Sequence, residues 1–331
     1  MKEMKEIKDQ SFVFLYGGQG SQVAGMGRDF ADHYPEIGAF YSHFFARYPV
    51  YKNLLDPSFD KINETFYAQP ALTLLGLAVT HLLKKEGVEP AATAGLSIGE
   101  FPALTTAGIY SDVSVLDIVA KRAALMDRRL KKRREDGFDD GMLAVIGLSG
   151  DAVEEQLVPF GKEVSITNIN APTQLVVGGE RATLEKVREA VLKAGARRAV
   201  MLECEGAFHT SVFEDEVDEL AAEISGHRAS DPVIPMPLNA LGEFMSDENV
   251  PEEILSLPTS ERYARLMSRQ MSTTVNLNGC LDTLLAEGWT HFIEIAPRAV
   301  LTPMLKKKSS DSVAFTVSDL HSFNALLATL N

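Results

Sequence analysis

Alternating apolar and polar stretches in the first part of the chain predict strands and helices in turn. Residues 12–16 form an apolar run that stops at Gly17-Gly18, which is typical of a buried strand entering a tight loop. The pattern next predicts helices over 71–85, 100–107 and 113–130, with a short strand over 93–96. Strands that alternate with helices predict a mainly parallel sheet and an α/β fold.

The pattern changes at Gly141, where strands begin to outnumber helices. Strands are expected over 142–148, 164–168, 175–177 and 198–203, and helices over 151–160 and 181–193. That order is βαββαβ, the ferredoxin-like split unit. We therefore expect a ferredoxin-like subdomain over 141–205, inserted into a catalytic core formed by 1–140 and 206–331. The core resumes with a helix over 213–224 and a last strand over 291–295.

Composition and charge narrow the function classes. The 331 residues include 32 Lys+Arg and 46 Asp+Glu, a net charge of −14, which disfavours a nucleic-acid partner. Two cysteines, Cys204 and Cys280, form no disulfide framework and indicate a reducing compartment. Residues 1–10 are charged and lack the apolar stretch of a secretory signal, and the apolar run 71–83 is too short and polar to span a membrane. We expect a soluble, cytoplasmic protein that binds neither nucleic acid nor membrane.

A Gly-x-Ser-x-Gly motif over residues 95–99 offers a candidate nucleophile, Ser97. Its glycines permit a sharp strand-to-helix turn that exposes the serine hydroxyl, and the N–H groups at the next helix start can bind an oxyanion. An ordinary strand-to-helix turn fits the motif equally well. Pro102 is unusual because it removes one N–H early in that helix.

A serine nucleophile needs a base, and the chain has seven histidines. His209 follows the end of a predicted strand and precedes a helix, a junction that commonly faces the site in α/β folds. The alternative is a histidine at the start of a helix bonded to the backbone. His81 falls within an apolar helix pattern and is interpreted as a core residue.

Other candidate chemistries find little support. The loop Gly17–Gln22 lacks the third glycine of a dinucleotide fingerprint, because Val23 stands there, and no Gly-Lys-Ser/Thr is present. The sequence contains neither His-Glu-x-x-His nor Cys-x-x-Cys, so no metal and no other cofactor is expected. Cys204 and Cys280 are interpreted as core residues, and Trp289 as packing against the last strand.

Taken together, these segments resemble the malonyl-CoA:acyl-carrier-protein transacylase family, which includes the acyltransferase domains of fatty-acid and polyketide synthases. The resemblance covers nearly the whole chain in the family's order. The segments that carry it are 14–22, 25–27, 69–72, 95–100, 121–126, 170–174, 176–179, 207–209, 269–270 and 294–297.

The resemblance implies roles for particular residues. Ser97 would attack the malonyl thioester, and His209 would take its proton and later activate the carrier thiol. The backbone carbonyl of Gln270 would orient His209. Backbone N–H groups of Gln19 and Ile98 would form the oxyanion hole.

Arg122 would bind the malonyl carboxylate. The chemistry favours this independently, because a guanidinium donates two hydrogen bonds to a carboxylate and stays charged when desolvated. From the sequence alone, Arg122 also fits a solvated position on a helix.

The chain departs from the family pattern at several positions. Leu96 stands where the family has a histidine, which leaves the acyl selectivity open. Pro102 replaces a small residue, and Ala296 and Arg298 stand where glycines are common. Phe208 resembles the malonyl-selective form, in which its bulk leaves little room for a branched acyl group.

We therefore expect an [acyl-carrier-protein] S-malonyltransferase with an α/β-hydrolase-like core, transferring malonyl from malonyl-CoA to the phosphopantetheine thiol of an acyl-carrier protein. The pathway would be fatty-acid or polyketide biosynthesis, the acyl group would pass through a Ser97 ester, and coenzyme A enters only as the thioester substrate. A basic run is the candidate docking site for an acidic carrier: Arg128, Arg129, Lys131, Lys132, Arg133 and Arg134. Two alternatives stay open, an editing hydrolase on the same scaffold and a non-catalytic carrier-binding module.

Overall fold

The structure, a computed structural model, describes residues 11–330, so the expectation for residues 1–10 lies outside the described part. The chain divides into two compact units. Of the described residues, the first unit comprises 11–123, 230–237 and 283–330, and the second comprises 124–229 and 238–282. The second unit is larger than the predicted insertion 141–205, since it also includes residues 124–140, 206–229 and 238–282. The predicted boundaries stay a prediction.

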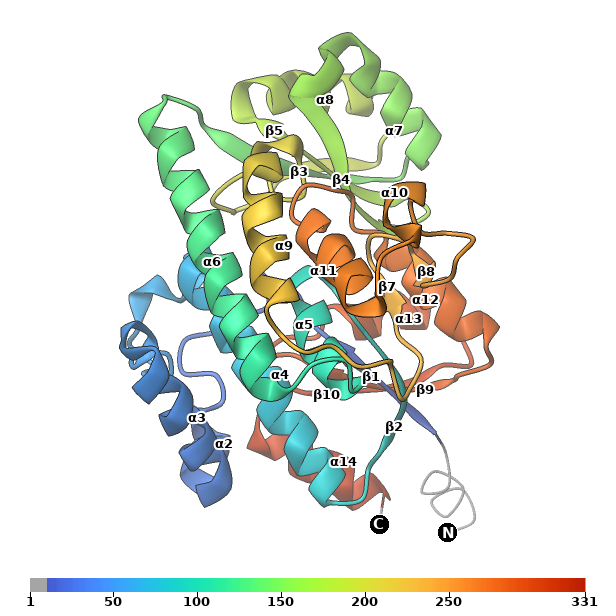
Figure 1. The fold of residues 1–331 in the computed structure, drawn as a ribbon. Helices are drawn as coiled ribbons and strands as arrows, with labels where there is room; N and C mark the ends of the chain where they lie inside the picture. Colours follow the sequence, from blue (N-terminus) through green and yellow to red (C-terminus); the bar gives the residue numbers. More distant parts are fainter. Residues whose placement is uncertain (1–10, 331) are drawn as a thin grey trace. The chain divides into compact units, whose positions relative to one another are not determined.

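The first unit contains a four-stranded parallel sheet of order β10-β9-β1-β2 (Figure 1). The strands are β1 (Phe12–Tyr16), β2 (Pro90–Gly95), β9 (His291–Ile295) and β10 (Val313–Val317). Phe14 of the central strand β1 pairs with Thr93 on one side and Ile293 on the other. All five residues of β1 are buried, as the apolar run predicted. The parallel α/β fold is confirmed, but β9 is not the last strand.

Helices of the first unit follow the strands along the chain. They are α2 (Arg28–His33), α3 (Pro35–Arg47), η1 (Pro49–Tyr51), η2 (Asp60–Asn63), α4 (Thr65–Lys85), η3 (Ser97–Gly99), α5 (Glu100–Thr106), α13 (Leu301–Lys308) and α14 (Leu320–Leu330). By length and composition α4 could cross a membrane, but 83% of its apolar window is buried, as in a core helix. The long α6 (Asp112–Glu135) begins in the first unit and ends in the second.

The interpretation of His81 as a core residue is wrong. His81 lies on the exposed side of α4, and its Nε2 lies 2.7 Å from Oδ2 of Asp112. This hydrogen bond raises the pKa of His81, and burial opposes the rise. The apolar run around His81 belongs to the other faces of the helix.

The second unit contains an antiparallel sheet of order β4-β5-β3-β6. Its elements occur as β3 (Asp140–Ile146), α7 (Gly150–Leu157), η4 (Val158–Glu163), β4 (Val164–Ala171), β5 (Gln174–Glu180), α8 (Arg181–Lys193) and β6 (Arg198–Met201). This is the strand order of the ferredoxin-like split unit. Val145, Val177, Leu184 and Val187 are all fully buried in the core that the sheet shares with its helices.

The remaining elements lie in the second unit or at its edges. They are η5 (Ser211–Glu216), α9 (Val217–Ser225), β7 (Pro237–Leu238), β8 (Glu243–Phe244), α10 (Glu252–Leu255), α11 (Thr259–Arg269) and α12 (Leu277–Ala286). The helix predicted over 213–224 is therefore a 3-10 turn followed by α9. Helices α9 and α11 pack against each other (Figure 1).

Candidate active site

Backbone strain singles out two residues of the described chain. Among residues 11–330, the non-glycine residues with positive φ are Ser97, at 54°, and His209, at 60°. A left-handed backbone conformation costs free energy for a residue with a Cβ, and such residues cluster at functional sites. The two residues that the sequence predicts as nucleophile and base are the two that the fold holds in this conformation.

The glycines around Ser97 are required by close backbone contacts. A Cβ at Gly95 would lie 2.0 Å from the carbonyl carbon of Gly99. A Cβ at Gly99 would lie 2.3 Å from the carbonyl oxygen of Tyr16, at the end of β1. The spacing of the motif therefore produces a sharp turn between β2 and α5 that packs against the neighbouring strand. Pro102 is tolerated because it lies in the first turn of α5, where its missing N–H has no partner within that helix.

The glycine loop after β1 packs against the Ser97 turn. A Cβ at Gly18 would lie 2.8 Å from the carbonyl oxygen of Leu96, so only glycine fits there. The Ser21 hydroxyl donates to the carbonyl of Gly18 at 2.7 Å. The side chain of Gln19 donates to the hydroxyl of Thr65 at 3.0 Å. Gln19 and Ile98, the predicted oxyanion donors, thus belong to two backbone segments in contact within the first unit.

The departure at Ala296 is accommodated by Gly17. A Cβ at Gly17 would lie 2.6 Å from the Cβ of Ala296. The loop that carries Ala296 and Arg298 is held by Glu294, a buried carboxylate of β9 that accepts three N–H bonds at the start of α13. Its donors are the backbone N–H groups of Val300, Leu301 and Thr302, at 2.7–2.8 Å.

Arg122 is buried, so the solvated alternative is wrong. Arg122 is 1% exposed, and its side chain is the largest that is fully buried within the described residues. The guanidinium carbon lies 5.5 Å from the centre of the Phe101 ring, a cation–π contact. Burial lowers the pKa of Arg122 to about 10, and attraction to Glu100 opposes the decrease. At neutral pH, Arg122 is a buried cation.

The burial of Arg122 has a signal in the sequence. Residues three and four positions away on a helix share its face, and here they are Ile118, Val119, Leu125 and Met126, all buried. A charged residue in the middle of an apolar stripe is the exception that marks a paired or functional group. Glu100, which the sequence prediction gave no role, is also 1% exposed and directly precedes Phe101.

In the second unit, His209 is oriented by a backbone carbonyl. It is 5% exposed, and its Nδ1 lies 2.6 Å from the carbonyl oxygen of Gln270, the C-cap residue directly after α11. A carbonyl oxygen only accepts, so Nδ1 carries the proton and Nε2 is left as the basic nitrogen. The neighbouring Phe208 is buried and stacks on Phe213, with ring centres 6.0 Å apart.

The two units therefore hold different parts of the predicted site. The first unit holds the predicted nucleophile, oxyanion donors and carboxylate-binding residue: Gln19, Leu96, Ser97, Ile98 and Arg122. The second unit holds Phe208, His209 and Gln270. Within residues 11–330, no cluster of three or more His, Cys, Asp or Glu side chains is suited to hold a metal ion.

The basic run at the end of α6 is paired with acidic side chains of the same unit. Each of its six cations has a carboxylate within 4 Å. The pairs are Arg128–Glu219, Arg129–Asp215, Lys131–Asp127 and Arg133–Asp140 at 2.7 Å, Lys132–Asp136 at 3.2 Å and Arg134–Glu205 at 3.8 Å. The positive field expected from the sequence is therefore largely compensated.

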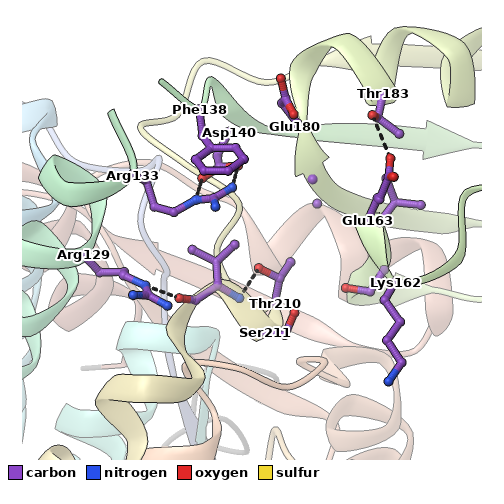
Figure 2. Close-up of a pocket in the computed structure, with 15 residues that line it drawn as sticks. Arg129, Arg133, Phe138, Asp140, Lys162, Glu163, Glu180, Thr183, Thr210 and Ser211 are labelled. Carbon is purple, nitrogen blue, oxygen red and sulfur yellow. Dashed lines mark hydrogen bonds and ion pairs between the residues drawn. The ribbon is translucent and has the colours of Figure 1, made fainter. Parts of the chain in front are cut away.

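Two cations of the run are structural. Arg129 and Arg133 line a cavity of about 450 Å³ in the second unit (Figure 2). Figure 2 shows the Arg133 guanidinium between Asp140, which accepts two bonds at 2.7 Å, and the ring of Phe138, whose centre is 3.5 Å away. Arg129 donates to the carbonyl of Val212, close to His209 in the chain. Lys131 and Lys132, by contrast, have side chains 63% and 62% exposed.

The fold, with its sharp turn at Ser97, is that of an acyl-transfer enzyme. More narrowly, the chain belongs to the acyl transferase domain family, which residues 13–323 match. It is 28% identical to a malonyl CoA-acyl carrier protein transacylase of Bacillus subtilis over 96% of both chains.

The chain is also similar to solved structures of malonyl transacylases. The chain matches a crystal structure of MCAT from Streptococcus pneumoniae with a TM-score of 0.86 and 31% identity, over 97% of this chain and 100% of the other. It also matches a malonyl-transacylase, PlMCAT, in complex with the type II polyketide acyl-carrier protein AntF. That match has a TM-score of 0.83 and 25% identity over 96% of this chain and 99% of the other.

Proposed function

We propose that this protein transfers the malonyl group from malonyl-CoA to the phosphopantetheine thiol of an acyl-carrier protein, in fatty-acid or polyketide biosynthesis. The observation that carries the proposal is the fully buried cation Arg122, in the same unit as the strained Ser97. A neutral acyl chain needs no buried guanidinium, whereas a malonyl carboxylate leaving water needs a charge partner.

In the first half of the reaction, Ser97 Oγ attacks the thioester carbonyl as His209 Nε2 removes its proton. The negative oxygen of the tetrahedral intermediate is bound by the backbone N–H groups of Gln19 and Ile98. The C–S bond then breaks, the proton on His209 passes to the coenzyme A sulfur, and malonyl remains as an ester on Ser97.

In the second half, the carrier thiol gives its proton to His209 and attacks the ester carbonyl. Collapse of the intermediate returns the proton to Ser97 and releases malonyl on the carrier. The Gln270 carbonyl keeps His209 in the tautomer that both halves need. Phe208 and Leu96 would border the acyl group and restrict its size.

Intact-mass measurement after mixing with malonyl-CoA tests this function. A malonyl adduct on the protein, discharged by holo carrier protein and stable in its absence, supports the transferase. Loss of the adduct in buffer alone indicates the editing hydrolase, and the lack of any adduct indicates a non-catalytic carrier-binding module. The proposal includes a cytoplasmic location, which the free thiols of Cys204 and Cys280 favour.

The exposed part of the basic run is the proposed carrier-docking element. Reversing charge in Lys131→Glu with Lys132→Glu should raise KM for carrier protein by about 3–10-fold at low salt, because exposed pairs are weak and these cations can exchange partners. Malonyl loading from malonyl-CoA should not change. The matched control is Lys186→Glu with Lys193→Glu on α8 of the same unit. Equal carrier kinetics in both pairs of variants would reject docking on this run.

A further inference from the structure

The loop that carries His209 fixes its own shape through one side chain. The Thr210 hydroxyl donates to the carbonyl of Ala207 at 2.7 Å and accepts from the N–H of Val212 at 3.3 Å. The N–H of Phe213 donates to the carbonyl of Thr210 at 3.2 Å. These bonds join the loop to itself, so they do not by themselves fix its place in the second unit. The left-handed backbone of His209 persists only where surrounding contacts hold it.

Arg129 on α6 attaches this loop to the rest of the second unit. Its Nε donates to the carbonyl of Val212 at 2.5 Å, a bond marked in Figure 2, and its Nη2 donates to Oδ2 of Asp215 at 2.7 Å. The Oε2 atom of a second carboxylate, Glu216, lies 3.6 Å from the same Nε. The Arg129 side chain is only 17% exposed. One guanidinium therefore holds both the loop, three residues after His209, and the turn that follows it.

We propose that Arg129 is a positioning residue for His209, which fixes the loop so that the imidazole keeps its hydrogen bond to the Gln270 carbonyl. The inference rests on the proposed role of His209 as general base. The role is one of positioning because Arg129 acts through the backbone between Val212 and His209. A planar guanidinium suits this role, since its nitrogens bind a carbonyl and a carboxylate at once and in fixed directions.

Arg133 on the same helix provides a matched control. It lies one turn after Arg129, lines the same cavity and has a similarly covered side chain, 22% exposed. Its two bonds go to Asp140 at the start of β3 rather than to the loop 207–213. Loss of either arginine removes a partly buried ion pair, so a difference between the two variants reports on the contact with the loop.

The variants Arg129→Met and Arg133→Met test the proposal in single-turnover adduct formation, followed by intact mass. At saturating malonyl-CoA, Arg129→Met should form the adduct about 10–100-fold more slowly, because a small displacement of a catalytic group has effects of this size. The malonyl-CoA concentration that gives half the maximal rate should change less than about two-fold. Acetyl loading should slow by the same factor, since both acyl groups need the base. Arg133→Met should stay within about two-fold of the wild-type rate, and equal slowing in the two variants overturns the proposal.

A double variant shows whether Arg129 acts through His209. In a His209→Ala background, Arg129→Met should slow adduct formation by less than about two-fold, because the group that it positions is gone. A further slowing of the full size would place its effect elsewhere and overturn the proposal. A normal adduct rate in His209→Ala alone would remove the base role, and with it this inference. A slow His209→Ala together with a normal Arg129→Met rejects only the positioning role.

The proton on Nδ1 of His209 gives a spectroscopic measurement that does not depend on activity. Nuclear magnetic resonance of protein with nitrogen-15-labelled histidine would detect this proton, and its absence in His209→Ala would assign the signal. The signal should be present in the wild type and in Arg133→Met, and broadened or lost in Arg129→Met. An unchanged signal in Arg129→Met contradicts the proposal.

Arg129→Lys decides the question where the melting temperature shows that Arg129→Met folds poorly. Lysine keeps the charge, but its ammonium cannot reproduce the directed bonds of the guanidinium to both partners. The adduct should then form about 3–10-fold more slowly than in the wild type, whereas Arg133→Lys should match the wild type. A wild-type rate in Arg129→Lys would overturn the proposal.

Discussion

Ser97→Ala should abolish the covalent malonyl adduct and reduce malonyl transfer by a factor on the order of 10⁴ or more, as expected when a nucleophile is removed. The reason is chemical, because alanine has no oxygen that could form the ester. The strained turn exposes only the side chain of residue 97, so no neighbouring residue of the turn replaces it. His209→Ala should form the same adduct, but orders of magnitude more slowly, because the general base is lost. Intact mass against time separates the two variants.

The fold of Ser97→Ala should be native, so its melting temperature is the control. Alanine fits the space of serine, and the close contacts of Gly95 and Gly99 are unaffected. A malonyl adduct of normal yield and rate in Ser97→Ala would contradict the mechanism. An adduct that forms at the normal rate in His209→Ala would remove His209 from the reaction and leave Ser97 in place.

Much of the fold could be predicted where hydrophobic periodicity and glycines agree. The strands 12–16 and 291–295 and the helix 181–193 have the predicted bounds, because each is a clear apolar pattern ended by turn residues or charge. Strand β10 escaped prediction because it lies at the sheet edge, where only Val317 is fully buried and the apolar signal is weak. The hairpin strands β4 and β5 extend beyond their predicted ends, since backbone pairing continues past the apolar residues.

The site shows where sequence reasoning reaches its limit. The Gly-x-Ser-x-Gly spacing predicts the turn at Ser97 because the glycines are needed for backbone contacts that any such turn makes. His81 was wrongly placed by residue type, because this histidine in an apolar helix is exposed. For Arg122 the sequence left a solvated position open, and the structure shows that the residue is buried. Periodicity shows which face of a helix a residue occupies. What covers that face depends on residues distant in the chain, such as Phe101, whose ring contacts Arg122.

Arg122→Ala should lower kcat/KM for malonyl transfer by about 10²–10³-fold or more, while acetyl transfer falls little or rises. Breaking a buried charge pair typically costs about 3–5 kcal/mol, and each 1.36 kcal/mol corresponds to about ten-fold in rate. Competitive loading of Ser97 from malonyl-CoA and acetyl-CoA measures the change. A malonyl preference that survives would make Arg122 a structural residue.

Arg122→Lys should restore malonyl loading only in part, and the restoration should depend on pH. An ammonium cannot reproduce the two-bonded contact of a guanidinium with a carboxylate. Burial lowers the pKa of a lysine from an ordinary value of about 10.4, by up to about 3–5 units at fully buried positions. The charged form binds malonyl, so loading should be greatest at low pH and decline as pH rises through the lowered pKa.

Wild-type Arg122, whose pKa is lowered only to about 10, should show no such decline between neutral pH and pH 9. Malonyl-to-acetyl loading ratios measured across that range would distinguish the two proteins, and a flat ratio in Arg122→Lys would show that the charge at this position does not select the substrate.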